Sequence, residues 1–369
     1  MSVEYRVLQP HDVQVSKGHQ QFALDVLLGL SQSPKSLPSK YMYDAEGDRL
    51  FQRIMELPEY YLTQCELNIF ENHKDEIADL IGSPCLNLVE LGVGDGQKTT
   101  VLLNHFLKRG MDFRYVPIDI SETAVQGLLG KLDQHSPALH IEGLVAEYFD
   151  GLKWLSNMKR ERNVVLFLGS NIGNFSHSEA RVFLYSLWNA LNDGDQLLIG
   201  FDLKKDIGQL IMAYNDSQGI TSQFNINMLN RINYELGADF NPSRFQYYSS
   251  YNVFSGAMES YLVSCKRQEV FIETLNQSFF FDAWEPIHTE YSHKYLLSDI
   301  ILLAQETGFE IVAQLFDSRQ YFTDCLWQVR KRKGNGFEIG SRTGTSLHLN
   351  YPLHSEDNRP PAWPSGSGP

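Results

Sequence analysis

Residues 86–98 read Leu-Asn-Leu-Val-Glu-Leu-Gly-Val-Gly-Asp-Gly-Gln-Lys. The apolar run from Leu86 to Leu91 has the length and composition of a buried parallel strand. Glycines then stand at every second position, 92, 94 and 96, and a run suited to a helix, residues 98–107, follows at once. Glycine allows the backbone to turn sharply and to approach a ligand without an intervening Cβ. This order of strand, glycine turn and helix predicts the first half of a nucleotide-binding βαβ unit.

The spacing of the glycines indicates the kind of nucleotide. Loops that bind dinucleotides usually read G-x-G-x-x-G, whereas here Glu90 stands two residues before a compressed G-x-G-x-G. This pattern resembles that of class I S-adenosylmethionine (SAM) methyltransferases. SAM has no pyrophosphate, so such a loop has to admit only adenosine and an amino-acid tail. A glycine turn without a nucleotide is the alternative for this motif taken alone.

A carboxylate at the end of the next strand supports the nucleotide interpretation. Residues 114–118 form a second β-rich run, and Asp119 follows it about twenty residues after the glycine loop. A carboxylate at the tip of the second strand of such a unit accepts both ribose hydroxyls. Ser121 is the expected N-cap of the next helix, through about Leu132. We therefore favour a cofactor role for Asp119 over a role as a turn cap only.

Composition limits the partners of this chain. The 369 residues carry a formal net charge of −14, and the 43% hydrophobic and 21% charged content is ordinary for a globular protein. Nucleic-acid binding needs a concentrated basic face, so we expect no nucleic-acid partner. We also expect no membrane partner, because no apolar run reaches the length of a membrane span. The N-terminus lacks a signal-like pattern and the four cysteines form no C-x-x-C motif, which predicts reduced thiols and a cytoplasmic protein.

Further strands extend the βαβ unit into a sheet. Apolar runs at 139–146, 163–168 and 196–201 alternate with helical patterns, as in a doubly wound sheet. Ligands of such sheets lie beyond the carboxyl ends of the strands, so Gly92, Asp119, Glu147 and Gly169 should converge on one crevice. Residues 244–282 alternate in strand fashion and predict an antiparallel insertion. A helix at 298–307 and two strands, 309–316 and 325–329, close the ordered chain.

The flanking segments differ from this core. Before the glycine loop, helices are predicted at 21–30, after an N-cap at Asp44, and from an N-cap at Thr63 to about Ile81. Beyond Lys333 the composition turns to Gly, Ser, Thr, Asn and Pro, which is typical of a disordered tail or of residues left by cloning.

A set of long motifs resembles one specific family. Together they resemble the histidine-specific N-alpha-methyltransferases of ergothioneine biosynthesis, over about Ser33 to Arg330. In chain order the motifs are 39–44 (Ser-Lys-Tyr-Met-Tyr-Asp), 57–61 (Leu-Pro-Glu-Tyr-Tyr), 90–99 (Glu-Leu-Gly-Val-Gly-Asp-Gly-Gln-Lys-Thr), 115–121 (Tyr-Val-Pro-Ile-Asp-Ile-Ser), 168–174 (Leu-Gly-Ser-Asn-Ile-Gly-Asn), 229–240 (Leu-Asn-Arg-Ile-Asn-Tyr-Glu-Leu-Gly-Ala-Asp-Phe) and 289–295 (Thr-Glu-Tyr-Ser-His-Lys-Tyr).

The resemblance implies the fold and the reaction. The fold would be a class I SAM-methyltransferase, Rossmann-like doubly wound α/β sheet with an antiparallel reversed last strand, plus a smaller α+β domain. Residues 1–68 and 203–294 would bind the substrate, and residues 69–202 and 295–333 would bind SAM, with 334–369 as the tail. The reaction would be the transfer of three methyl groups from SAM to the α-amine of L-histidine, which gives hercynine.

The resemblance also implies the site residues. SAM would contact Gly92, Lys98, Asp119, Glu147 and Tyr148. The substrate backbone would be held by Gly169, Asn174 and Tyr214. Tyr43 would lie near the amine as the catalytic residue, Tyr60 would pack on the imidazole, and Glu290 and Ser292 would bond its nitrogens. The sequence departs from the family at three positions: Glu147 and Asn215 stand where Asp is usual, and Ser260 stands where a larger apolar residue is usual. The departures at Ser260 and Asn215 leave the identity of the substrate side chain open.

Elementary chemistry agrees with this set. Methyl transfer from a sulfonium is an in-line displacement, so the protein chiefly aligns an unprotonated amine. Tyr43 is suited to position that amine and pass on its proton, and the faces of Tyr43, Tyr60 and Tyr61 suit a trimethylated cation. A buried Glu290 would accept from an imidazole N–H and would be left unpaired by an indole or phenyl ring.

Several alternatives stay open at this stage. Taken singly, the tyrosines are more often core residues, and Glu290 is more often a solvated charge. A metal site at His288, Glu290 and His293 is disfavoured, because it lacks a third strong ligand. The other functions are a SAM methyltransferase for another amino acid or histidine-related amine, a binding module without catalysis, and a nicotinamide oxidoreductase, which the glycine spacing disfavours. We expect a monomer whose partners are small molecules.

Overall fold

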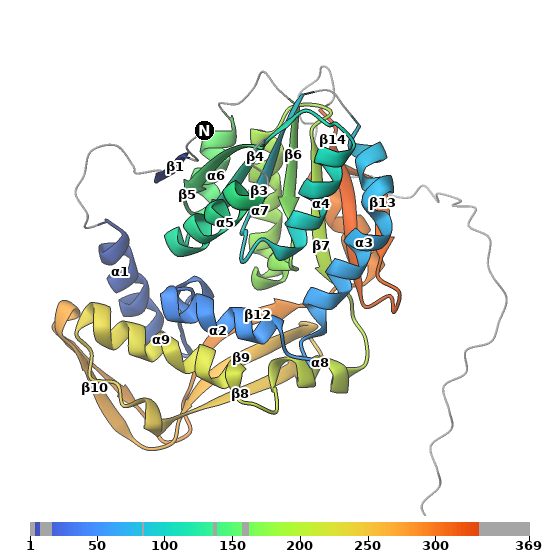
Figure 1. The fold of residues 1–369 in the computed structure, drawn as a ribbon. Helices are drawn as coiled ribbons and strands as arrows, with labels where there is room; N and C mark the ends of the chain where they lie inside the picture. The colour runs from blue at the N-terminus through green and yellow to red at the C-terminus, as the bar shows by residue number, and fades with distance from the viewer. Residues whose placement is uncertain (1–3, 8–16, 83–84, 136–138, 157–161, 332–369) are drawn as a thin grey trace, which may run out of the picture. The chain divides into compact units, whose positions relative to one another are not determined.

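An eight-stranded sheet is the frame of the protein (Figure 1). The computed structural model describes residues 4–7, 17–82, 85–135, 139–156 and 162–331; the predicted tail lies outside these ranges. All neighbouring strands of the sheet are parallel except β14, which runs antiparallel to both of its neighbours. The strand order is β1 (Glu4–Val7), β5 (His140–Val145), β4 (Phe113–Asp119), β3 (Leu86–Leu91), β6 (Arg162–Phe167), β7 (Gln196–Asp202), β14 (Phe322–Val329) and β13 (Phe309–Phe316).

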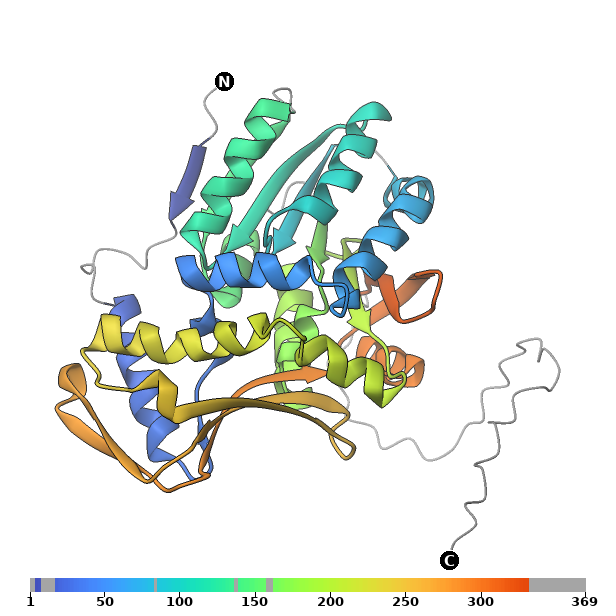
Figure 2. The same cartoon turned by 60° about the horizontal axis from the view of Figure 1, so that its bottom comes forward.

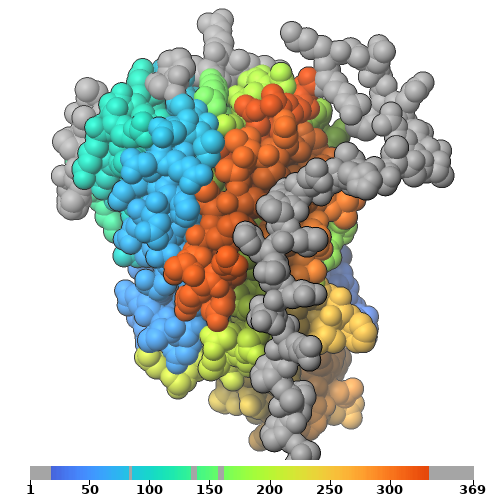
Figure 3. Space-filling view, turned by 90° about the vertical axis from the view of Figure 1, so that its right-hand side faces the viewer, coloured from blue at the N-terminus to red at the C-terminus, as the bar shows by residue number. Residues whose placement is uncertain are grey.

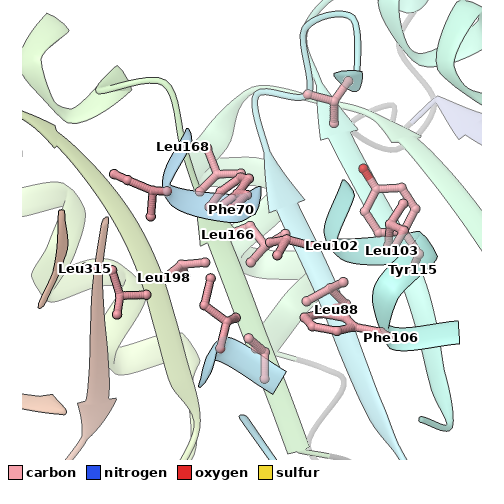
Figure 4. Close-up of a cluster of buried hydrophobic side chains, with 14 of the residues drawn as sticks. Phe70, Leu88, Leu102, Leu103, Phe106, Tyr115, Leu166, Leu168, Leu198 and Leu315 are labelled. Carbon is pink, nitrogen blue, oxygen red and sulfur yellow. The ribbon is translucent and has the colours of Figure 1, made fainter. Parts of the chain in front are cut away.

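Helices cover both faces of this sheet. One face packs against α3 (Tyr61–Ile81), α4 (Gln97–Lys108) and α5 (Glu122–His135). Figure 4 shows part of this core, in which Phe70 of α3 and Phe106 of α4 lie over Leu88 and Leu166 of the sheet. The other face packs against α6 (Tyr148–Ser156), α7 (His177–Ala190) and α10 (Leu297–Glu306). In Figure 3, α3 lies next to the closing strands β13 and β14.

A second, smaller layer lies at the carboxyl ends of the parallel strands (Figures 1 and 2). Its four-stranded sheet has the order β2 (Lys35–Ser36), β12 (Pro286–His293), β9 (Ala257–Ser264) and β8 (Phe245–Asn252). A hairpin, β10 (Gln268–Ile272) and β11 (Gln277–Phe281), extends this layer. Its helices are α1 (Lys17–Ser31), α2 (Ala45–Met55), α8 (Ile207–Tyr214) and α9 (Ile220–Leu236), and α2 and α9 lie side by side. Short 3₁₀ turns are η1 (Ser39–Met42), η2 (Asn171–Asn174), η3 (Pro242–Arg244) and η4 (Glu273–Leu275).

The fold class predicted from the sequence is confirmed. The doubly wound sheet, the reversed last strand and the antiparallel insertion are all present. The Asp44 cap is also confirmed, because its side chain accepts from the Gly47 N–H at 2.7 Å. The predicted cap at Thr63 is wrong: α3 begins at Tyr61 directly after the turn at Pro58, and Thr63 is buried inside the helix. The Ser121 hydroxyl does cap α5, accepting from the Ala124 N–H at 3.1 Å.

Candidate active site

The glycine turn after β3 has the conformation that only glycine adopts easily. Gly92 has φ +78°, and a Cβ there would lie 2.8 Å from both the Tyr148 hydroxyl and the Asn171 amide nitrogen. Gly96 has φ +69°, and a Cβ there would lie 2.2 Å from Leu128 Cδ1. Positive φ and close neighbours together exclude a side chain at both positions. Glycine at these two positions therefore lets the turn pack closely against Tyr148, Asn171 and Leu128.

Asp119 is held rigidly at the end of β4. One carboxylate oxygen accepts from the Val93 N–H at 2.9 Å and the other accepts from the Ser121 N–H at 2.9 Å. Burial raises the pKa of Asp119, although these backbone hydrogen bonds oppose the shift. The backbone N–H groups of Gly94 and Ile120 also face this carboxylate and lower its pKa. This arrangement fits the ribose contact predicted from the sequence.

Three adjoining pockets lie at the carboxyl ends of these strands. The glycine-loop pocket, of about 150 Å³, is lined by Gly92, Gly94, Lys98 and Asp119. The Glu147 pocket, of about 300 Å³, is lined by Lys40, Glu147, Phe149 and Phe175, and it shares Gly92, Asp119 and Tyr148 with the first. The Glu290 pocket, of about 40 Å³, is lined by Thr221, Phe224, Tyr214, Glu290 and Ser292. Tyr43, Asn171 and Asn174 line all three pockets.

The structure brings every predicted site residue to these pockets. The five predicted SAM contacts line the glycine-loop pocket, the Glu147 pocket or both: Gly92, Lys98, Asp119, Glu147 and Tyr148. The predicted substrate contacts line the Glu290 pocket: Tyr43, Tyr60, Gly169, Asn174, Tyr214, Glu290 and Ser292. Tyr61 differs from the expectation. It lines none of the three pockets, and its hydroxyl donates to Asp202 at 2.8 Å.

Glu290 is the charged group of the smallest pocket. It lies on β12 opposite Ser260 of β9. Among the residues that the structure describes, none donates a hydrogen bond to its carboxylate. Burial raises the pKa of Glu290 to about 7, and the nearby Lys294 opposes this shift. The pocket therefore contains a carboxylate whose acceptor capacity a ligand N–H can use.

A buried polar network lies behind this pocket and was not predicted. The Tyr214 hydroxyl is 2.6 Å from the Ser292 hydroxyl, and Lys294 donates to both. Lys294 also pairs with Asp202 at 2.8 Å, and both side chains are fully buried. The only sequence signal was the position of Lys294 inside the motif 289–295.

A second buried charge pair lies beside the glycine loop. Lys98 is paired with Glu66 of α3, which is fully buried. The other oxygen of Glu66 accepts from the Gly169 N–H at 2.7 Å, so that N–H is already engaged within the protein. Glu66 was missed because it reads as an ordinary helix residue; its place among the apolar residues of α3 was the available signal.

Glu147 takes part in an ion pair between the two layers. Lys40, next to Tyr41 in η1, is 3.0 Å from a Glu147 carboxylate oxygen and 3.3 Å from Asp25 of α1. The Glu147 side chain is about half exposed. The predicted adenine contact thus lies where a residue of the smaller layer also reaches the pocket.

Neither a metal-binding cluster nor a membrane-spanning helix occurs in the described part of the chain. No three His, Cys, Asp or Glu side chains there are grouped to hold a metal ion. His288 stacks on Tyr291, and His293 lies against His177. No helix within the described ranges is long and apolar enough to cross a membrane.

Comparison with known proteins places the chain in a family. A family model described as "Histidine-specific methyltransferase, SAM-dependent" matches residues 22–329. The chain belongs to this family. A histidine N-alpha-methyltransferase from Mycobacterium tuberculosis is 35% identical over 83% of this chain and 92% of its own length. One of the same name from Mycolicibacterium smegmatis is 35% identical over 77% of this chain and 87% of its own.

A more distant relative of this chain carries another name. A 4-dimethylallyltryptophan N-methyltransferase from Claviceps fusiformis is 28% identical over 73% of this chain and 81% of its own length. The match to the family confirms the resemblance seen in the sequence and identifies the protein as a SAM-dependent methyltransferase.

Proposed function

We propose that this protein transfers three methyl groups from SAM to the α-amino group of L-histidine, giving hercynine for ergothioneine biosynthesis. The observation that carries the choice of histidine is the Glu290 carboxylate, which lies in a pocket next to the glycine loop and receives no hydrogen bond from the residues the structure describes. An imidazole supplies an N–H to such a carboxylate, and a phenyl ring does not. Membership of the family supports the same substrate.

The donor side is assigned to the glycine-loop and Glu147 pockets. Asp119 accepts the ribose hydroxyls, Gly92 lines the pocket beside them, and Tyr148 lies against the nucleoside. Glu147 accepts from the adenine amino group, and its contact with Lys40 leaves a second carboxylate oxygen for this role. Lys98 is assigned to the charged tail of SAM.

The acceptor side is assigned to the Glu290 pocket. Tyr60 packs on the imidazole ring, while Glu290 and Ser292 contact its nitrogens. Asn174, Tyr214 and Gly169 hold the amino-acid backbone, and for Gly169 the free group is the carbonyl, because its N–H is bonded to Glu66. Residues 1–68 and 203–294 make up the substrate-binding domain in this proposal, although β1 itself pairs with β5 of the large sheet.

Catalysis rests on alignment. SAM supplies an electrophilic methyl group, and the chain holds the amine lone pair in line with it. Burial and the nearby Glu290 raise the pKa of Tyr43 well above its usual value, so this side chain stays a phenol. A phenol oxygen accepts a hydrogen bond from the amine but does not take its proton. Tyr43 therefore orients the amine, and the proton leaves to water.

Tyr43→Phe tests this role. The Tyr43 hydroxyl has no hydrogen-bond partner among the described residues, so its loss should leave stability within about 0.5 kcal/mol. We expect kcat to fall roughly 10- to 100-fold, since one orienting contact at the reacting atom is lost. Steady-state kinetics and thermal unfolding measure both effects. Tyr248→Phe, at an exposed tyrosine outside the pockets, is the matched control; an unchanged kcat for Tyr43→Phe contradicts the role.

The substrate itself is tested by mass spectrometry. The purified protein is incubated with SAM and each of the twenty amino acids, and three added methyl groups on histidine alone is the expected result. The second candidate is another amino acid, favoured by the small Ser260 beside Glu290 and by the relative named for 4-dimethylallyltryptophan. Methylation of a different amino acid would replace histidine in the proposal. A monomeric state and a cytoplasmic location complete the proposal.

A further inference from the structure

Lys294 is fully buried at the end of β12 and takes no part in the mechanism above. An ammonium group has three N–H donors and no acceptor. In this structure all three have partners: Asp202 at 2.8 Å, the Tyr214 hydroxyl at 2.9 Å and the Ser292 hydroxyl at 2.8 Å. Two of these partners are residues that the proposed function assigns to histidine.

The bonds of Lys294 restrict what the two hydroxyls can do. Tyr214 and Ser292 are 2.6 Å apart, so one of them donates to the other. Each oxygen also accepts an N–H from Lys294, which uses one of its two lone pairs. Of the two O–H hydrogens, only one remains for the pocket, together with one open lone pair. Lys294 thus turns two freely rotating hydroxyls into a fixed pair with one donor and one acceptor.

Asp202 holds Lys294 in place. Burial alone would raise the pKa of Asp202, but Lys294 and Lys205 lower it below its usual value, so the carboxylate is charged. Asp202 also accepts from the Tyr61 hydroxyl and pairs with Lys205. Lys205 contacts Tyr61 at 2.8 Å and contacts neither Tyr214 nor Ser292. Both lysines therefore pair with Asp202, but Lys294 also contacts the Tyr214 and Ser292 hydroxyls, whereas Lys205 contacts Tyr61.

We infer that Lys294 is a positioning residue for the substrate, which orders the Tyr214 and Ser292 hydroxyls and places a positive charge beside Glu290. This inference rests on the proposed function, because it assumes that the Glu290 pocket holds histidine. Lys294 faces Glu290 from the same strand, and Tyr43, Tyr60, Tyr214 and Tyr247 face it from other elements. Burial raises the pKa of each of these tyrosines, so all four stay uncharged phenols. Among these five neighbours, Lys294 is therefore the cation whose field acts on the Glu290 carboxyl.

The test is Lys294→Met, with Lys205→Met as the matched control. Kinetics with L-histidine at saturating SAM, and calorimetric titration of L-histidine in the presence of S-adenosylhomocysteine, are both run across pH 6 to 9. For Lys294→Met we expect KM and Kd for histidine to rise at least about tenfold, with the affinity for SAM unchanged. The acid limb of histidine binding should move to higher pH, because the carboxyl of Glu290 loses the charge that opposes its protonation. Ionisations of histidine itself are the same in both proteins and cancel in the comparison.

The control separates positioning from simple stability. Lys205→Met should lower the thermal stability but leave KM, Kd and the acid limb in place. Equal changes in the two variants, or an unmoved acid limb in Lys294→Met, would overturn the inference. If Lys294→Met fails to fold, Lys294→Gln, which keeps a hydrogen-bond donor for Asp202 but removes the charge beside Glu290, is compared with Lys205→Gln by the same measurements.

The wild-type arm separates the two proposals. Wild-type protein that binds histidine without methylating it counts against the proposed function, while the binding profiles of the two lysine variants still decide the role of Lys294. Wild-type protein that neither binds nor methylates histidine overturns both.

Discussion

Glu290→Gln should weaken histidine binding roughly 10- to 100-fold and, at pH 8, make the protein more stable. The binding loss follows because a neutral amide replaces the charged acceptor of an imidazole N–H. The gain in stability follows because the wild-type carboxylate is ionised in a buried pocket with no donor from the described protein. The pKa of Glu290 is about 7, against an ordinary value of 4.5 for a glutamate, so the ionised form is disfavoured by up to about 3 kcal/mol above pH 7.

The sign of the pH dependence makes this result specific. The raised pKa means that the folded protein binds the proton more tightly than the unfolded chain does, so the destabilisation is complete above pH 7 and disappears below about pH 4.5. The advantage of Glu290→Gln in free energy of unfolding should therefore shrink as the pH falls from 8 to 5. Denaturant unfolding at several pH values measures it.

Glu259→Gln is the matched control for this change. Glu259 lies on the neighbouring strand β9 and accepts hydrogen bonds from Asn252, at 3.0 Å, and from Tyr261. Because its carboxylate is satisfied, its replacement should not stabilise the protein or alter histidine affinity. A Glu290→Gln protein that keeps wild-type histidine affinity would refute the assigned role of this carboxylate.

Lys98→Met should destabilise the protein by about 3–5 kcal/mol and also weaken SAM binding. Burial alone would lower the pKa of Lys98, but Glu66 raises it above its usual value, so Lys98 stays a cation. Burial and Glu66 also raise the pKa of Asp324, the third buried group of this cluster, well above its usual value. Removing the lysine leaves the Glu66 carboxylate buried without its cation. Calorimetry with SAM and chemical denaturation measure the two losses.

A double variant separates the structural role of Lys98 from its ligand role. Glu66→Gln keeps an acceptor for the Gly169 N–H and removes the charge that Lys98 would leave unpaired. The Glu66→Gln/Lys98→Met protein should therefore recover much of the stability. If Lys98 contacts SAM, as proposed, SAM affinity stays at least about tenfold below wild type. Recovery of both properties would show that Lys98 acts only through the fold.

The sequence predicted the large sheet and the cofactor crevice well, for a local reason. Each buried strand is a contiguous apolar run, and Gly92 and Asp119 follow directly after such runs. Parallel topology then brings the ends of the runs together. The assignments of Tyr60, Tyr214 and Glu290 depended on family motifs, because nothing local distinguishes a pocket tyrosine from a core tyrosine.

The buried charge pairs could not be predicted in the same way. Glu66 and Lys98 lie on different helices, and Asp202 and Lys294 lie in different sheets. Each looks like an ordinary polar residue until the fold excludes water and gives it a partner. Thr63 shows the same limit on a small scale: a capping residue type stood near the helix start, but α3 begins at Tyr61, three residues before the start that a cap at Thr63 would give.

Three residues, Tyr43, Asn171 and Asn174, border the donor pockets and the acceptor pocket alike. When one ligand binds and orders these three side chains, the second ligand binds to side chains that are already ordered. Thermodynamic linkage makes such an effect mutual. The factor by which the methyl donor raises the affinity for the amino acid equals the factor by which the amino acid raises the affinity for the methyl donor. The dissociation constant of each ligand for this enzyme therefore depends on whether the other ligand is bound. Each constant has to be given together with the occupancy of the other ligand.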